Sequence, residues 1–364
     1  MEGGANVLTG CAQFSLAVIE PATPAASFAH EVRAGLTAAP KRLPCRFFYD
    51  EAGSQLFEEI CRLPEYYVTR AERELLTARA GEIVASAPNV TTLVELGSGS
   101  AAKTRLLIEA LLRGQDTLRY VPVDISRSAL EASARALLAA YPRLVVDAVA
   151  AEYQDGLPYL RNLAVLQAGG AAADTPKGPT PKLVLWLGSN VGNLTRTEAA
   201  AFLRRVRETM GPRDRLLIGI DLRKGRAVLE PAYDDAQGVT ARFNKNLLAR
   251  MNRELGGHFD LDAFDHRAIY HEAEGRIAME LISRRHQVVP IDALGIDVPF
   301  AAGDAIHTED SYKYSDEEIH TLAAAAGYAV ERQWYDAGRR FSENLFRPLP
   351  TAYGGARARG GTEH

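Results

Sequence analysis

Residues 92–100 read TLVELGSGS, a largely apolar run that leads directly into a glycine-rich turn. An apolar run without alternation is typical of a strand that is covered on both faces. A helix is expected directly after the turn, from Ala102 to Leu112. Glycines let a ligand approach the backbone closely, and a helix N-terminus offers free N–H groups. The segment therefore predicts the ligand-binding end of an α/β sheet, for a dinucleotide or for another ligand.

The alternation of strand and helix continues along the chain as far as residue 221. Further strands are expected at Arg119–Asp124, Leu144–Val149, Lys182–Leu187 and Arg215–Asp221, with helices at Arg127–Ala140 and Thr197–Met210. A helix before the first strand is expected to begin at Thr69, with Glu72 as its capping-box partner, and to run to Ala85. Apolar strands separated by amphipathic helices predict an α/β fold with a parallel sheet covered on both faces.

Beyond residue 222 this rhythm breaks, and it returns only near the end of the chain. The segment between is expected to contain a long helix, Val239–Leu255, and a strand, Arg276–Ser283. Ser315 and Glu318 then form a capping box for a helix that ends near Gly327. Two strand-like runs at 329–335 and 340–346, on either side of residues 336–338, predict a C-terminal antiparallel hairpin.

The break in rhythm divides the chain into two domains. Residues 71–222 and 313–349 are expected to form the α/β domain. Residues 26–70 and 223–312 are expected to form an inserted α+β domain over the carboxyl edge of the sheet. A surface loop is expected at 168–181, and flexible tails at 1–25 and 350–364.

Composition narrows the class of protein. The 364 residues are 47% hydrophobic and carry a net charge of −4, from 42 Lys and Arg and 46 Asp and Glu. A slightly acidic chain argues against nucleic acid as a partner. Three cysteines form no disulfide framework, which favours a reducing cytoplasm. No apolar run is long enough to span a membrane, and no basic segment of a signal peptide is seen at the N-terminus.

Polar residues follow three of the predicted strands. Asp124 closes the second strand, where an acid can hold both hydroxyls of a ribose or can cap the next helix. Glu152 and Tyr153 follow the third strand, where they either meet an adenine or form an ordinary loop pair. The segment LGSNVGNL, residues 187–194, follows the fourth strand and supplies amide donors and acceptors. A plain turn is the alternative, but we favour a functional loop at this position.

Six segments, taken together, resemble one enzyme family. They are FYDEAGS at 48–54, LPEYYVTR at 63–70, ELGSG at 95–99, LGSNVGNL at 187–194, YDDAQGVT at 233–240 and TEDS at 308–311. The chain resembles, over residues 30–348, the L-histidine Nα-methyltransferases of ergothioneine biosynthesis. The resemblance implies a class I, Rossmann-like methyltransferase sheet and S-adenosylmethionine as the methyl donor. It also implies addition of three methyl groups to the α-amine of histidine, giving hercynine.

The resemblance also assigns roles to individual residues. The methyl donor would be held by Gly97, Lys103, Asp124, Glu152, Tyr153 and Gly188. Histidine would be held at its amino-acid end by Tyr66, Asn193 and Tyr233, and at its imidazole by Glu309 and Ser311, with Met279 packed against the ring. Tyr49 would lie near the amine as the catalytic residue. Many relatives carry Asp-Phe where this chain has Glu152-Tyr153, so the adenine contacts depart from the family pattern there.

The chemistry of the reaction agrees with these residue types. Methyl transfer needs a neutral amine in line with the methyl group, so positioning can supply most of the acceleration without a metal. A carboxylate at Glu309 beside the Ser311 hydroxyl suits an imidazole, which offers one N–H and one acceptor nitrogen. The alternative for Glu309 is a solvated loop charge. His258, His266 and His271 lie among carboxylates but lack paired ligand spacing, so no metal site is expected.

We therefore expect a cytoplasmic, monomeric enzyme whose partner is the small molecule L-histidine. One rival keeps the fold and the donor but methylates another amino acid, such as tryptophan. A second rival is an NAD(P)-dependent dehydrogenase that uses the glycine turn, and a third is a metabolite-binding protein without catalysis.

Overall fold

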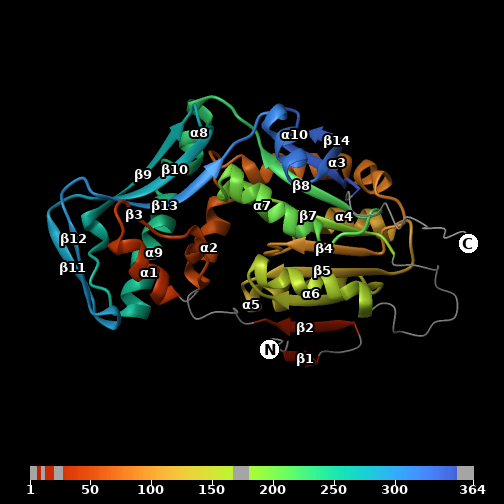
Figure 1. The fold of residues 1–364 in the computed structure, drawn as a ribbon, viewed down its shortest axis with the longest axis horizontal. Helices are drawn as coiled ribbons and strands as arrows, with labels where there is room; N and C mark the ends of the chain where they lie inside the picture. The colour runs from red at the N-terminus through yellow and green to blue at the C-terminus, as the bar shows by residue number, and fades with distance from the viewer. Residues whose placement is uncertain (1–5, 10–12, 20–27, 167–179, 351–364) are drawn as a thin grey trace, which may run out of the picture.

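The computed structural model describes residues 6–9, 13–19, 28–166 and 180–350. Within these residues the main sheet has nine strands (Figure 1). In sheet order they are β1 (Asn6–Thr9), β2 (Phe14–Val18), β6 (Leu144–Ala150), β5 (Leu118–Asp124), β4 (Thr92–Leu96), β7 (Lys182–Trp186), β8 (Arg215–Asp221), β15 (Phe341–Pro348) and β14 (Tyr328–Tyr335). The strands from β2 to β8 pair in parallel, and the β14–β15 hairpin joins β8 antiparallel. The expected α/β fold class is confirmed.

Helices cover both faces of the main sheet because successive residues of its strands point to opposite sides. On β4, Val94 and Leu96 pack in one core, whereas Leu93 packs in the other. The first face is covered by α6 (Tyr153–Leu166), α7 (Arg196–Arg207) and α10 (Asp316–Ala325). The second face is covered by α3 (Val68–Ser86), α4 (Thr104–Leu112) and α5 (Arg127–Ala140).

The strand order reverses at β4, and this reversal positions the site. From β4 the chain moves to β5 and β6 on one side and later returns to β7 and β8 on the other. Ligands of open α/β sheets bind outside the carboxyl ends of the strands at such a reversal. The turn at Gly97–Gly99 follows β4, and the 3₁₀ turn η4 (Asn190–Asn193) follows β7. Both turns expected to be functional therefore lie at the reversal.

A second, smaller sheet stands beside the carboxyl ends of the main one. Its strands, in order, are β3 (Lys41–Arg42), β13 (Ala305–Tyr312), β10 (Arg276–Ser283) and β9 (Phe264–His271). A two-stranded sheet pairs β11 (Gln287–Ile291) with β12 (Ile296–Phe300). These two sheets form a second unit together with four helices: α1 (Phe28–Thr37), α2 (Glu51–Ile60), α8 (Arg226–Tyr233) and α9 (Val239–Leu255). The 3₁₀ turns of this unit are η2 (Cys45–Phe48), η5 (Leu261–Ala263) and η6 (Asp292–Leu294). In Figure 1 this unit lies to the left of the main sheet, and β13 runs from it towards α10.

This second unit has a core of its own. Apolar side chains of α9 and of the small sheet, among them Leu247, Leu248, Ile277 and Leu281, form one buried cluster. Phe341 of β15 joins the same cluster, so the two units share apolar contact. The domain boundaries expected from the sequence stay a prediction.

Two expectations about the N-terminal third differ from the structure. The tail expected at residues 1–25 contains β1 and β2, and β2 pairs with β6 because the alternating FSLAV segment buries Leu16 against the sheet edge. The helix expected to start at Thr69 starts at Val68, and its N-terminus has no side-chain cap. Instead, the Thr69 hydroxyl contacts the Cys61 thiol at 3.4 Å. Glu72 lies in the first turns of α3, and its side chain is fully buried in the protein.

Other expectations fall partly outside the described residues. Residues 168–179 of the expected loop at 168–181 and residues 351–364 of the expected C-terminal tail lie there. The helices α6 and α8 were not expected, whereas the capping box at Ser315 and Glu318 is confirmed. In the described ranges, no helix combines the length and the hydropathy needed to span a membrane.

Candidate active site

One cavity lies between the two units, at the carboxyl end of β7. It brings together eight residues to which the sequence assigned a role: Tyr49, Tyr66, Gly188, Asn193, Tyr233, Met279, Glu309 and Ser311. Its apolar wall comes from α2, α3 and α9, through Phe57, Val68 and Phe243. The segments that resembled one family are thus adjacent in space, although they are spread over more than 260 residues of sequence.

Strand geometry explains why Glu309 and Ser311 face the cavity together. They are two residues apart on β13, so their side chains leave the same face of the small sheet. Met279 stands directly opposite Glu309 on β10 and reaches the same cavity. Asp310, between them, points away and pairs with Arg276 at 2.6 Å and with His307 at 3.1 Å. The alternative of a solvated loop charge fits Asp310 better than Glu309.

Burial sets the protonation of the acidic and phenolic groups in this cavity. Burial raises the pKa of Glu309, the nearby Lys313 ammonium partly offsets this, and Asp310 adds a smaller increase, so that the resulting pKa is about 7. Burial also raises the pKa of Tyr49 well above its ordinary value, and the charge of Glu309 adds to that effect. Tyr66 is shifted in the same direction, mainly by burial. The tyrosines therefore stay neutral, and Glu309 can change its charge near neutral pH.

We predict that Glu309→Gln makes the protein more stable than the wild type at pH 8. Because the pKa of Glu309 is raised to about 7 in the folded state, its favourable contribution is complete below pH 4.5 and is lost as pH rises through 7. The neutral amide removes this loss, which is worth about 3 kcal/mol at pH 8 and much less at pH 5. Urea unfolding of both proteins at the two pH values measures it. Glu280→Gln, on the neighbouring strand, is the control, and parallel pH curves for Glu309→Gln and wild type would refute the prediction.

A buried lysine behind the cavity, Lys313, was not predicted from the sequence to have a role. Lys313 is fully buried and donates hydrogen bonds to Tyr233 Oη at 2.6 Å and to Ser311 Oγ at 2.8 Å. These two hydroxyls also lie 2.9 Å from each other. The ammonium is paired with Asp221 at the end of β8, at 2.8 Å. A signal was available, because residues 309, 311 and 313 are all polar and follow the period of two of a strand, with residue 313 directly after the end of β13.

The glycine turn after β4 packs closely against Tyr153. Gly97 has a φ of +76°, and a Cβ at this position would lie 2.3 Å from Tyr153 Oη. The Gly99 N–H donates to the Asp124 carboxylate at 2.9 Å, as does the Ser126 N–H. Asp124, Tyr153 and the turn therefore meet at one point. Burial raises the pKa of Asp124 despite these hydrogen bonds.

Two other residues expected to hold the donor are bound to protein groups. The Lys103 ammonium contacts the buried Glu72 carboxylate, which also accepts the Gly188 N–H at 2.6 Å. Glu72 thus ties the first turn of α4 to the loop after β7. The Glu152 carboxylate lies 3.3 Å from the Arg46 guanidinium of η2. The contact between Arg46 and Glu152 joins the two units, whereas the contacts of Glu72 lie within the main one.

The glycine turn after β4 lies next to the cavity. The Asn190 amide lines the cavity and lies 3.3 Å from the Cβ position of Gly97. The pKa of Tyr49, raised first by burial, is raised also by Glu309 and by Tyr153. Glu309 and Ser311 therefore lie on the same side of the sheet as the glycine turn.

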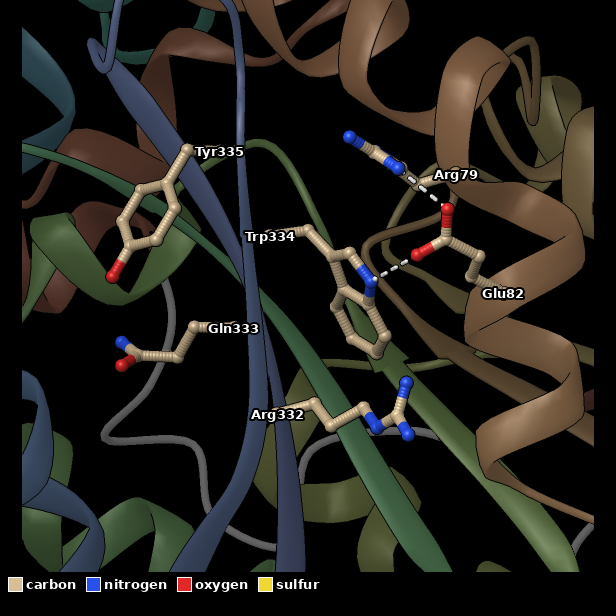
Figure 2. Close-up of a pocket in the computed structure, with 6 residues that line it drawn as sticks. All are labelled: Arg79, Glu82, Arg332, Gln333, Trp334 and Tyr335. Carbon is tan, nitrogen blue, oxygen red and sulfur yellow. Dashed lines mark hydrogen bonds and ion pairs between the residues drawn. The ribbon is translucent and has the colours of Figure 1, made fainter.

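A separate hollow lies between α3 and β14 and contains none of the expected site residues. Figure 2 shows Arg79 and the Trp334 indole pointing at Glu82, at 2.5 Å and 3.2 Å, on one side of β14. Arg332 lies on the same side of the strand, whereas Gln333 and Tyr335 point to the other. In the part of the chain that the structure describes, no three His, Cys, Asp or Glu side chains are grouped as metal ligands.

Comparison with known proteins gives consistent matches. A family model described as histidine-specific, SAM-dependent methyltransferase matches residues 28–348. A histidine N-alpha-methyltransferase from Mycolicibacterium smegmatis is 43% identical over 86% of this chain and 93% of its own length. Ergothioneine biosynthesis protein 1 from Neurospora crassa is 33% identical over 81% of this chain and 32% of its own length. A 4-dimethylallyltryptophan N-methyltransferase from Epichloe festucae var. lolii is 28% identical over 84% of this chain and 90% of its own length.

Proposed function

The chain belongs to the family of histidine-specific, S-adenosylmethionine-dependent methyltransferases, and on this premise we propose that it methylates the α-amine of L-histidine three times, giving hercynine. Hercynine formation would be the first step of ergothioneine biosynthesis. One observation carries the proposal: Glu309, Ser311 and Met279 line the same cavity as the loop at Gly188–Asn193, beside the glycine turn. The family match favours this function over the dehydrogenase and over the metabolite-binding protein.

The residues around the glycine turn fit the methyl donor. A Cβ at Gly97 would lie 2.3 Å from Tyr153 Oη, so glycine lets the Tyr153 side chain lie directly against the turn beside which we place the nucleoside. Asp124 uses part of its acceptor capacity on two backbone N–H groups and keeps lone pairs for ribose hydroxyls. S-adenosylmethionine supplies an electrophilic methyl group on a sulfonium. In our proposal Tyr153 packs near the adenine, and Gly188 lies close to the methionine end.

The other end of the cavity would orient histidine. Glu309 accepts a ring N–H, Ser311 meets the second ring nitrogen, and Met279 packs on the ring. Tyr66, Asn193 and Tyr233 then hold the amino-acid end so that the amine lone pair faces the glycine turn. The buried, largely aromatic walls exclude water. Orientation of this kind can account for most of the barrier lowering, and the proposal needs no metal.

Tyr49 is proposed to take part in removing protons between methylations. Its raised pKa, caused first by burial and then by Glu309, makes a free tyrosinate base unfavourable. A neutral phenol can still accept a proton from the amine when it passes its own proton on to water. We therefore assign Tyr49 a relay role instead of that of a permanent base.

The proposal includes a monomer that works in the cytoplasm. The thiols of Cys45 and Cys61 are free, as a reducing compartment would keep them.

The test uses purified protein with methyl-labelled S-adenosylmethionine and each of the twenty amino acids. We expect label to enter histidine alone, and the product mass to rise by three methyl groups. Tryptophan is the important alternative, because one relative is a methyltransferase of a tryptophan derivative. Transfer to tryptophan in preference to histidine, or to none of the twenty, would overturn the proposal.

A further inference from the structure

Lys313 stands directly behind the two hydroxyls at the imidazole end of the cavity. Its three ammonium protons each have an acceptor: Tyr233 Oη at 2.6 Å, Ser311 Oγ at 2.8 Å and Asp221 Oδ2 at 2.8 Å. Lys313 is fully buried, and it has no proton left for a ligand. Lys313 can therefore affect the hydrogen bonds of a substrate only through Tyr233 and Ser311.

The hydrogen bonds from Lys313 restrict what the hydroxyl pair can offer. Tyr233 Oη and Ser311 Oγ each accept one hydrogen bond from the ammonium and lie 2.9 Å apart, so one of them donates to the other. The oxygen that receives this bond has both lone pairs filled. It can then only donate its own proton to a ligand. If Tyr233 donates to Ser311, the Ser311 hydroxyl can only donate a hydrogen bond to the imidazole of a bound histidine.

The charge of Lys313 selects between the two directions. If Ser311 donated to Tyr233, it would keep a lone pair and accept a ring N–H. An ionised Glu309 can only accept, so it would take the other ring N–H. Such a ring is an imidazolium, and its positive charge would lie close to the buried ammonium of Lys313. Two like charges at short range in a buried site repel strongly. The direction in which Tyr233 donates to Ser311 avoids this cost and suits a neutral imidazole.

We propose that Lys313 is a positioning residue that makes Ser311 a hydrogen-bond donor, so that the pocket selects a neutral imidazole. One ring N–H then points to Glu309, and the ring lone pair points to Ser311. This inference rests on the proposed function, because it takes histidine as the substrate. A site that is built to donate rejects a ring without an acceptor, since its own donor would be left unpaired.

We expect the Lys313→Met variant to fold. Asp221 keeps the Lys224 ammonium at 2.6 Å and the Tyr67 hydroxyl at 2.9 Å, so its charge stays compensated. Methionine fills much of the volume of the lysine stem. Lys224→Met is the matched control, because it removes the other ammonium on Asp221 and leaves the bonds from Lys313 to Ser311 and Tyr233 in place.

The experiment measures kcat/KM for histidine and two kinds of analogue, each as both positional isomers. Pyrrole analogues keep a ring N–H and lack the acceptor nitrogen, whereas thiazole analogues keep the acceptor nitrogen and lack the N–H. In Lys313→Met we expect the preference for histidine over the pyrrole analogues to fall by roughly tenfold or more. The preference over the thiazole analogues should stay near the wild-type value, because it reports on Glu309.

Each outcome separates this inference from the proposed function. Failure of the wild type to methylate histidine would overturn the proposed function. Normal turnover by the wild type, with an unchanged histidine-to-pyrrole ratio in Lys313→Met, would overturn only the role of Lys313. An equal fall of that ratio in Lys224→Met would mean that Lys313 is merely structural. Should Lys313→Met not fold, Tyr233→Phe provides the test, since it also frees a lone pair on Ser311 and should lower the same ratio; an unchanged ratio there overturns the inference.

Discussion

Replacement of Glu309 by alanine is expected to lower kcat/KM for histidine by roughly 10²- to 10³-fold, because a buried charged hydrogen bond to the ring is lost. The Kd for S-adenosylmethionine should stay within about twofold of the wild-type value, since the glycine turn and Asp124 are not in contact with Glu309. Steady-state kinetics and calorimetric titration of the donor measure the two quantities.

The neighbouring residues of β13 supply a matched comparison. Asp310→Asn changes a carboxylate one position away that points out of the cavity towards Arg276. It should leave histidine turnover close to normal. Glu309→Gln keeps an acceptor oxygen for the ring N–H and should lose less activity than the alanine variant. If Glu309→Ala weakened donor binding as much as histidine turnover, Glu309 would have a structural role instead of a substrate-binding one.

The main sheet was predictable because its segments carry strong local signals. The bounds of β4, α5, β8, α9 and β10 agree with the sequence expectation at both ends. The helix α6 was missed because Gly156 and Pro158 weaken its helical pattern. Packing of Leu157 and Leu160 into the core outweighs that weakness. Tertiary contact of this kind is not visible in a single stretch of sequence.

The roles of Glu72 and Lys313 were not predicted from the sequence pattern. Thr69 and Glu72 have the spacing of a capping box, but the helix begins earlier and places Glu72 inside the protein against Lys103 and the Gly188 N–H. Lys313 was passed over because its partners Tyr233 and Asp221 are distant in sequence. Glu72 and Lys313 each carry a buried charge whose partners come from other helices, strands or loops. Family motifs supplied the cavity-lining residues, whereas the charges that hold them required the fold.

Replacement of Asp124 by alanine is expected to have the opposite signature to Glu309→Ala. We expect the Kd for S-adenosylmethionine to rise by roughly 10²-fold, which corresponds to about 3 kcal/mol for a carboxylate that accepts two ribose hydroxyls. The substitution also removes the acceptor of the Gly99 N–H, so the turn that the donor approaches loses a support. At saturating donor, the KM for histidine should change little, because the cavity residues on β13 are untouched.

The control for Asp124 is chosen on the neighbouring strand. Asp147 on β6 is a half-buried carboxylate that pairs with Arg119, at 2.5 Å, and lies outside the cavity. Asp147→Ala should affect stability more than donor affinity. Asp124→Asn keeps one acceptor oxygen and should fall between the wild type and the alanine variant in donor affinity. A Kd for the donor that is unchanged in Asp124→Ala would remove this residue from the donor site. Its role would then be to accept the N–H of Ser126, the residue that caps α5.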